Sequence, residues 1–195
     1  MEPYATALIV LLASASNPQT LAIDTDAVVP DFRVEVFGYV EYDFQRRVER
    51  YVELRRTLEE GVPPLTVTDD PAAIGRAEAA LARKIQVARG PAQGQLFTPA
   101  ISAVLKRTLL RVVSANTLDI IMDENPGEFP YLINGTYPKR RPLSTMPATV
   151  LAVLPLLPDD IQYRFLGRHL ILHDTRANVI LDRISCALAC SDLGN

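Results

Sequence analysis

Hydrophobic residues recur at spacings of three and four over most of the chain before residue 125, which is the period of an α-helix with one buried face. The strongest runs predict helices over residues 36–60, 70–90 and 98–112. The second and third of these begin with a capping residue followed by proline, which is typical of a helix N-terminus. Shorter helices are expected over residues 117–123 and just after Pro147.

Beyond residue 160 the pattern changes to short runs rich in β-branched, aromatic and other apolar residues, which is typical of β-strands. We expect strands over residues 162–166, 169–174 and 179–184. Gly167 and Arg168 form a two-residue connection between the first two strands. Glycine at the first position of such a connection suits a type II′ turn, in which its φ angle is positive.

This turn also fixes which residues of the two strands face each other. It places Phe165 opposite Leu170, and Tyr163 opposite Leu172. All four side chains then share one face, as a half-buried sheet requires. The predicted fold class is therefore α+β, with three to five helices followed by a C-terminal three-stranded antiparallel β-meander.

Residues 125–146 contain four prolines and two glycines, so no regular structure is expected there. Loops longer than about 12–15 residues are uncommon in compact domains and are often functional. Tyrosine and arginine are favoured as anchors of binding interfaces. The candidate binding residues of this segment are Tyr131, Tyr137, Arg140 and Arg141. The alternative interpretation is a basic loop that contacts only solvent.

The 195-residue chain has a formal net charge of −3, with 48% hydrophobic and 22% charged residues. These values are typical of a globular domain and argue against wholesale disorder. A chain of this length buries enough surface to hold a core without a metal or a disulfide. Nucleic-acid binding normally depends on a strong basic footprint, so no nucleic-acid partner is expected.

Residues 5–15 form an apolar run that is too short to cross a bilayer of about 30 Å as a helix. The run ends in small residues that suit signal-peptide cleavage. A signal peptide normally has Lys or Arg ahead of the apolar run, and none is present here. Either the true start lies further upstream, or the run is a buried N-terminal strand or helix. We expect a signal peptide or leader over residues 1–22, a single α+β domain over residues 23–195 and no transmembrane anchor. The predicted location is periplasmic or secreted.

Cys186 and Cys190 lie four residues apart, which is neither a redox motif nor half of a recognisable zinc site. They are either two small buried hydrophobic residues or a disulfide formed in an oxidising compartment. His169 and His173 are the only histidines, and a strand would separate them by roughly 13 Å. One metal ion needs both nitrogens within about 2.1 Å. We therefore expect no bound metal, and no motif indicates another cofactor.

Searches for catalytic motifs find no nucleophile elbow and no phosphate-binding glycine loop. Asp174, Asn178 and Asp182 lie around the second predicted turn, where such side chains normally bond to the turn's own backbone. The leading hypothesis is a non-enzymatic exported domain that binds a protein partner or a component of the cell envelope. The alternative is a hydrolase or other enzyme whose site forms only in the folded chain.

Three stretches of the chain resemble a group of uncharacterised exported bacterial proteins. The first two are Gly94–Pro99 (GQLFTP) and the helix pattern Val48-x-x-Tyr51-x-x-Leu54. The third, in the tail, comprises Tyr163, Arg164, Phe165, Leu166, Gly167, Arg168, Leu170, Leu172, Asp174, Ala177, Asn178 and Asp182. The resemblance implies export and no particular activity, and the two cysteines are not part of the pattern.

Overall fold

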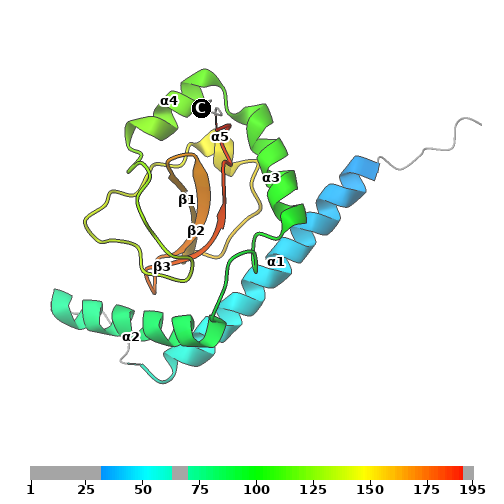
Figure 1. The fold of residues 1–195 in the computed structure, drawn as a ribbon. Coiled ribbons are helices and arrows are strands. Elements are labelled where there is room, and N and C mark those ends of the chain that lie inside the picture. The colour runs from blue at the N-terminus through cyan, green and yellow to red at the C-terminus, as the bar shows by residue number, and fades with distance from the viewer. Residues whose placement is uncertain (1–31, 63–69, 191–195) are drawn as a thin grey trace, which may run out of the picture. The chain divides into compact units, whose positions relative to one another are not determined.

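The structure is a computed structural model that describes residues 32–62 and 70–190. Within these residues, five helices precede three strands (Figure 1), which confirms the predicted α+β class. The helices are α1 (Phe32–Glu59), α2 (Pro71–Arg89), α3 (Pro99–Val112), α4 (Ala115–Asp123) and α5 (Ala148–Leu151). The strands are β1 (Ile161–Leu166), β2 (His169–Asp174) and β3 (Val179–Ile184).

Side-chain caps explain where three of the helices begin. Asp70 accepts a hydrogen bond from the amide of Ala72 at 2.9 Å, and Thr98 and Ser114 cap α3 and α4 in the same way. These hydrogen bonds satisfy amides that have no partner within the helix. The cap at Ser114 places the start of α4 two residues before the predicted position. Helix α1 begins at Phe32, four residues before the predicted start at residue 36.

The three strands form one antiparallel sheet in the order β1-β2-β3. The predicted register is confirmed, because Phe165 pairs with Leu170 and Tyr163 pairs with Leu172. Gly167 has a φ of +55°, the left-handed conformation that its turn requires. The meander follows from turn chemistry and apolar pattern, both of which are local in the sequence.

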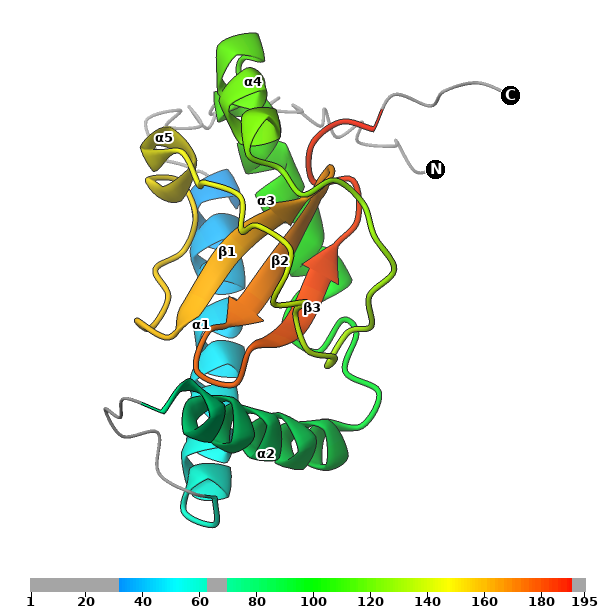
Figure 2. The same cartoon turned by 90° about the vertical axis from the view of Figure 1, so that its left-hand side faces the viewer.

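Both faces of the sheet are covered, whereas the sequence pattern predicts a half-buried sheet. Phe165, Leu170 and Leu172 belong to the main core, which they share with buried residues of α1, α2 and α3. On the opposite face, Leu166 and Ile171 belong to a second, smaller cluster with aromatic side chains of the irregular segment 125–146. Figure 2 shows this segment in front of the sheet and α1 behind it. The segment replaces a second layer of helices.

The irregular segment also bonds to both outer strands. Next to β3, the amide of Asn134 donates to the carbonyl of Ile180 at 2.7 Å, and the amide of Ile180 donates to the carbonyl of Gly135 at 2.9 Å. Next to β1, the hydroxyl of Ser144 accepts from the amide of Phe165 and donates to its carbonyl, both at 3.0 Å. The backbone of the sheet therefore finds partners beyond its own three strands.

The predicted leader over residues 1–22, and the boundary that separates it from the domain, lie outside the described residues. Across the described ranges 32–62 and 70–190, none of the helices combines the length and the apolar character that crossing a membrane requires.

Candidate functional site: an arginine-lined pocket beside two buried carboxylates

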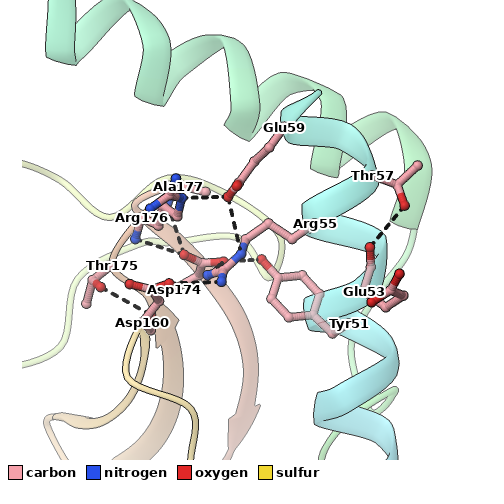
Figure 3. Close-up of polar contacts among 10 residues, drawn as sticks. All are labelled: Tyr51, Glu53, Arg55, Thr57, Glu59, Asp160, Asp174, Thr175, Arg176 and Ala177. Atoms are coloured by element: carbon pink, nitrogen blue, oxygen red, sulfur yellow. Dashed lines mark hydrogen bonds and ion pairs between the residues drawn. The ribbon is translucent and has the colours of Figure 1, made fainter. Parts of the chain in front are cut away.

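Asp174, at the end of β2, is fully buried and joins the β-meander to α1. Its Oδ1 accepts hydrogen bonds from the amides of Arg176 and Ala177 at 2.9 and 3.0 Å, as expected for an aspartate that opens a turn. Its Oδ2 accepts from the hydroxyl of Tyr51 at 2.5 Å and from Nη1 of Arg55 at 3.1 Å (Figure 3). The carboxylate is therefore held by two backbone and two side-chain donors.

Arg55 is the cation that balances this buried charge. Its side chain also lies 3.0 Å from a carboxylate oxygen of Asp160 and 3.5 Å from one of Glu59 (Figure 3). Burial acts to lower the pKa of Arg55, but the charge and hydrogen bond of Asp174 outweigh it and raise that pKa. Burial, followed by the charge of Asp174, raises the pKa of Tyr51 far above its usual value. Arg55 thus stays charged and Tyr51 stays protonated.

Asp182, in the middle of β3, is the second fully buried carboxylate. Its oxygens accept hydrogen bonds from the amides of Gly94, Leu96 and Phe97, each at 2.9 Å, and from the amide of Arg183 at 2.8 Å. Backbone amides are effective donors to a buried carboxylate because the hydrogen bonds are charge-assisted. The side chain therefore fixes the loop that joins α2 to α3.

The prediction that Asp174, Asn178 and Asp182 bond to their own turn is right for Asp174 only. Asp182 bonds mainly to the distant loop over residues 91–98. Asn178 donates to the carbonyl of Tyr137 at 2.9 Å, and its Oδ1 lies 3.0 Å from Nε2 of His173. Two of the three side chains thus tie the sheet to segments that are far away in the sequence.

A pocket of about 300 Å³ lies next to these two carboxylates, between α1, the end of α2 and the loop over residues 91–98. Its polar lining comes from three arginines, one tyrosine and one glutamine, and no carboxylate takes part. Apolar lining comes from Leu54, Ala88 and Leu96. The polar residues are Arg47, Arg50, Tyr51, Arg89 and Gln95. The lining is therefore positively charged.

Two of these arginines belong to α1 and differ in how they are held. Arg47 donates from Nε to Asp43 at 2.9 Å and from Nη1 to the carbonyl of Gln95 at 3.0 Å. Arg50 is exposed and donates only from Nε, to the carbonyl of Arg46 at 3.3 Å. Within the described part of the chain, neither Nη1 nor Nη2 of Arg50 has a hydrogen bond or a carboxylate partner. Its guanidinium is therefore available to a ligand.

Arg89, at the end of α2, is half-buried and bonded to neutral acceptors. It donates to the side chains of Asn134 and Gln95 at 3.3 and 3.4 Å, and to the carbonyl of Leu181 at 3.1 Å. Its guanidinium carbon lies 5.2 Å from the centre of the Tyr51 ring, a cation–π arrangement. Burial lowers the pKa of Arg89, and the nearby charges of Asp182 and Asp174 oppose this. Arginine nevertheless stays protonated in proteins.

The four residues predicted to form a binding surface do not lie together on an exposed patch. Tyr137 is buried, and its hydroxyl donates to the carbonyl of Pro142 at 2.6 Å. Tyr131 is half-buried beneath the guanidinium of Arg183, which is 5.6 Å from the ring centre. Arg140 and Arg141 are both exposed, and Arg141 lies over the Phe129 ring. A binding role stays a prediction, and its accessible part is Arg140 with Arg141.

The two histidines both lie on β2, as predicted, and each has its own partners. His173 is buried against the Tyr137 ring, and His169 is half-buried beside Glu128. Nδ1 of His169 also accepts from the amide of Cys186 at 3.0 Å. Among the residues that the structure describes, no three His, Cys, Asp or Glu side chains come together to hold a metal ion.

Cys186 and Cys190 form a disulfide, which decides between the two alternatives that the sequence leaves open. The loop that it closes packs against the turn between β1 and β2. The amide of Leu188 donates to the carbonyl of Arg168 at 3.1 Å, and Arg168 donates back to the carbonyl of Ala189 at 2.6 Å. Leu188 is buried in the main core, so this loop is part of the domain.

Sequence reasoning did not single out the pocket. Arg47, Arg50 and Arg55 all lie between the apolar positions of the first predicted helix, so the pattern does not distinguish them, whereas in the structure Arg55 is buried. One signal was present. Arg47, Arg50, Tyr51 and Leu54 lie at positions i, i+3, i+4 and i+7, which share one face of a helix. The contribution of Arg89 depends on how α2 packs, which no local pattern reveals.

No family model, no curated protein and no solved structure matches this chain. Residues of the helix pattern Val48-x-x-Tyr51-x-x-Leu54, of the GQLFTP stretch and of the tail come together in space. Tyr51 contacts Asp174, and the amides of the GQLFTP stretch surround Asp182. These residues therefore hold the elements that border the pocket.

Proposed function

We propose that this protein is an exported, non-enzymatic domain that binds an anionic group of an envelope component or of a protein partner. The binding site in this proposal is the pocket lined by Arg47, Arg50 and Arg89. The observation that carries it is the convergence of three guanidinium groups on one pocket whose lining contains no carboxylate. Arginine suits this role because its planar donors match carboxylate and phosphate oxygens.

The state of the nearby polar groups favours binding over hydrolysis, which is the alternative function. General acid–base catalysis needs a titratable group within reach of the substrate. Asp174 and Asp182 each accept four hydrogen bonds from protein donors. The hydroxyl of Tyr51 is bonded to Asp174, and burial raises its pKa. These groups hold the fold, and the pocket lining presents cations.

Export to the periplasm or the exterior is supported by three features. Residues 5–15 have the composition of a signal-peptide core. The chain also resembles a group of exported bacterial proteins. The disulfide between Cys186 and Cys190 suits an oxidising compartment, because such bonds are rare in the cytosol. Fractionation with intact-mass analysis tests this part, and a cytoplasmic protein that retains Met1 would contradict it.

The binding part is tested by retention of envelope extract on the immobilised protein. Wild-type protein should retain anionic components that high salt releases, and Arg50→Glu should lose them. Arg46→Glu is the matched control, because Arg46 is an exposed neighbour on α1 that does not line the pocket. Equal retention by the wild type and Arg50→Glu would show that the pocket is not the binding site.

A further inference from the structure

We infer that the anionic group bound in the arginine-lined pocket is a phosphate monoester. This inference rests on the proposed function and names the chemistry that the same pocket selects. The argument starts from the nitrogen atoms that the three arginines leave unbonded. In the described part of the chain, Nη2 of Arg47, both Nη1 and Nη2 of Arg50, and Nε of Arg89 make no hydrogen bond to protein.

These free donors come from three side chains on two helices. A carboxylate has two oxygens, and their acceptor sites lie in one plane. A phosphate monoester has three terminal oxygens that point in different directions, and each is a strong acceptor. Three separate guanidinium groups therefore match the number of oxygens of a phosphate better than that of a carboxylate. A phosphate diester has only two terminal oxygens and fits less well.

The charge of the lining points to the same ligand. Of the three arginines, only Arg47 has a carboxylate within ion-pair distance among the described residues, and that carboxylate is Asp43. A phosphate monoester carries a charge of about −1.5 to −2 at pH 7, because its second pKa is about 6. Leu54 and Leu96 add apolar surface to the pocket. That surface suits the organic part of an ester, which free phosphate lacks.

Calorimetric titration of the full-length mature protein with glycerol phosphate tests the inference. Glycerol phosphate should bind. Succinate, a dicarboxylate, should bind at least about tenfold more weakly, because the loss of one charge-assisted hydrogen bond lowers the affinity by at least about that factor. Arg50→Ala should weaken glycerol phosphate binding by about the same factor, whereas Arg46→Ala should leave it unchanged. Far-ultraviolet circular dichroism of both variants shows that they are folded.

The pH dependence separates a phosphate monoester from other anions. Binding of glycerol phosphate should strengthen several-fold as pH rises from about 5 to about 7, because the ligand gains its second charge near pH 6. The arginines stay charged throughout this range. Inorganic sulfate, whose charge is constant over the range, should show no such dependence. A pH profile that is the same for both ligands would overturn the inference.

Vesicles distinguish a lipid source of the phosphate from a soluble one. Phosphatidylcholine vesicles that contain phosphatidic acid present a monoester, and vesicles that contain phosphatidylglycerol present a diester. Arg50-dependent binding to the first and not to the second supports a lipid monoester, and binding of glycerol phosphate alone supports a soluble one. If succinate binds as tightly as glycerol phosphate and Arg50→Ala weakens both, the monoester inference is wrong while the anion site stands. If no anion binds, both are wrong.

Discussion

Two arginines of α1, Arg50 and Arg55, lie five residues apart and have opposite surroundings. Arg55 is buried and meets three carboxylates, from Asp174, Asp160 and Glu59. Arg50 is exposed, and among the described residues it meets none. A buried ion pair that is supported by hydrogen bonds holds elements in place, whereas a cation without a partner keeps its donors for a ligand.

This difference separates stability from binding along one helix. The network around Arg55 joins α1 to Asp160, just before β1, and to Asp174, at the end of β2 (Figure 3). Arg50 belongs to the group of residues that lines the pocket, and because its side chain is exposed it contributes little to packing. Substitutions of the first group should therefore lower the free energy of unfolding, and substitutions of the second should lower ligand affinity.

Arg55→Met should have the largest effect on stability. It leaves the carboxylate of Asp174 buried without its cation, which typically costs about 3–5 kcal/mol. Urea denaturation measures this change. The matched control is Arg56→Met, because among the described residues Arg56 pairs only with Glu53 and both side chains are 70% exposed. Such surface pairs contribute about 0–1 kcal/mol. Equal losses in the two variants would contradict the assigned role of Arg55.

Asp182→Asn should destabilise the protein by about 3 kcal/mol. Each carboxylate oxygen of Asp182 accepts from two amides, and an asparagine keeps only one oxygen, so in either orientation its NH2 group faces two amide donors. Hydrogen bonds to charged groups contribute about 1.5–3 kcal/mol each. Asp159→Asn serves as the control, because Asp159 is exposed. Thermal denaturation of the two variants checks the difference. An unchanged melting temperature for Asp182→Asn would show that the loop is held in another way.

Tyr51→Phe sharpens the comparison, because Tyr51 belongs to both groups. Its ring lines the pocket and its hydroxyl donates to Asp174. Removing the hydroxyl should cost about 1.5–3 kcal/mol, since the lost acceptor is charged. Binding of glycerol phosphate should change little, because the ring remains. Loss of affinity without loss of stability would place the hydroxyl in the binding site.

The same variant tests a pH dependence. Burial raises the pKa of Tyr51 above the value of about 10 that it has in the unfolded chain. The folded protein therefore keeps this proton when the unfolded chain begins to lose it, and stability falls as pH rises above about 10. Tyr51→Phe should make that fall shallower. An identical alkaline slope in both proteins, measured by urea denaturation, would contradict the raised pKa.

Charge reversal at Arg140 and Arg141 should have the smallest effect. Both side chains are exposed, so stability should stay within about 0.5 kcal/mol of the wild type. Affinity for glycerol phosphate should also be unchanged, since neither residue lines the pocket. Binding of a macromolecular partner should weaken if the predicted surface is used. A partner that binds the double variant as tightly as the wild type would remove the reason for singling out this loop.

Local sequence signals predicted the helices and strands of this fold. They could not predict the contacts between residues that are distant in the sequence. The caps at Asp70 and Thr98 and the glycine of the turn at Gly167 act within a few residues, so helix starts and strand register could be inferred. Three of the four donors to Asp182 are 85 to 88 residues away, and Tyr51 is 123 residues from Asp174. Two aspartates with similar local surroundings thus bond to different parts of the chain.

The pocket escaped prediction for a related reason. Arginines on the polar face of a helix look alike in sequence, and only the packing of α1 against the sheet and against α2 distinguishes Arg55 from Arg50. For Tyr137 the sequence misleads in the other direction, because it suggests an exposed side chain where the structure has a buried one. Its place among prolines, glycines and basic residues suggests exposure, yet its ring fills the outer side of the sheet beside Phe129 and His173.

The hydrogen bonds of the irregular segment to β1 and β3 have a consequence for how this protein behaves at high concentration. A three-stranded sheet has two free edges, and an unprotected edge can add a strand from another molecule. Here Ser144 occupies the outer backbone groups of Phe165, and residues 134–136 occupy those of β3. One stretch of chain therefore covers part of both edges and should hinder strand addition there. Proteolytic cleavage within it would leave the helices intact and open two sites for intermolecular strand addition.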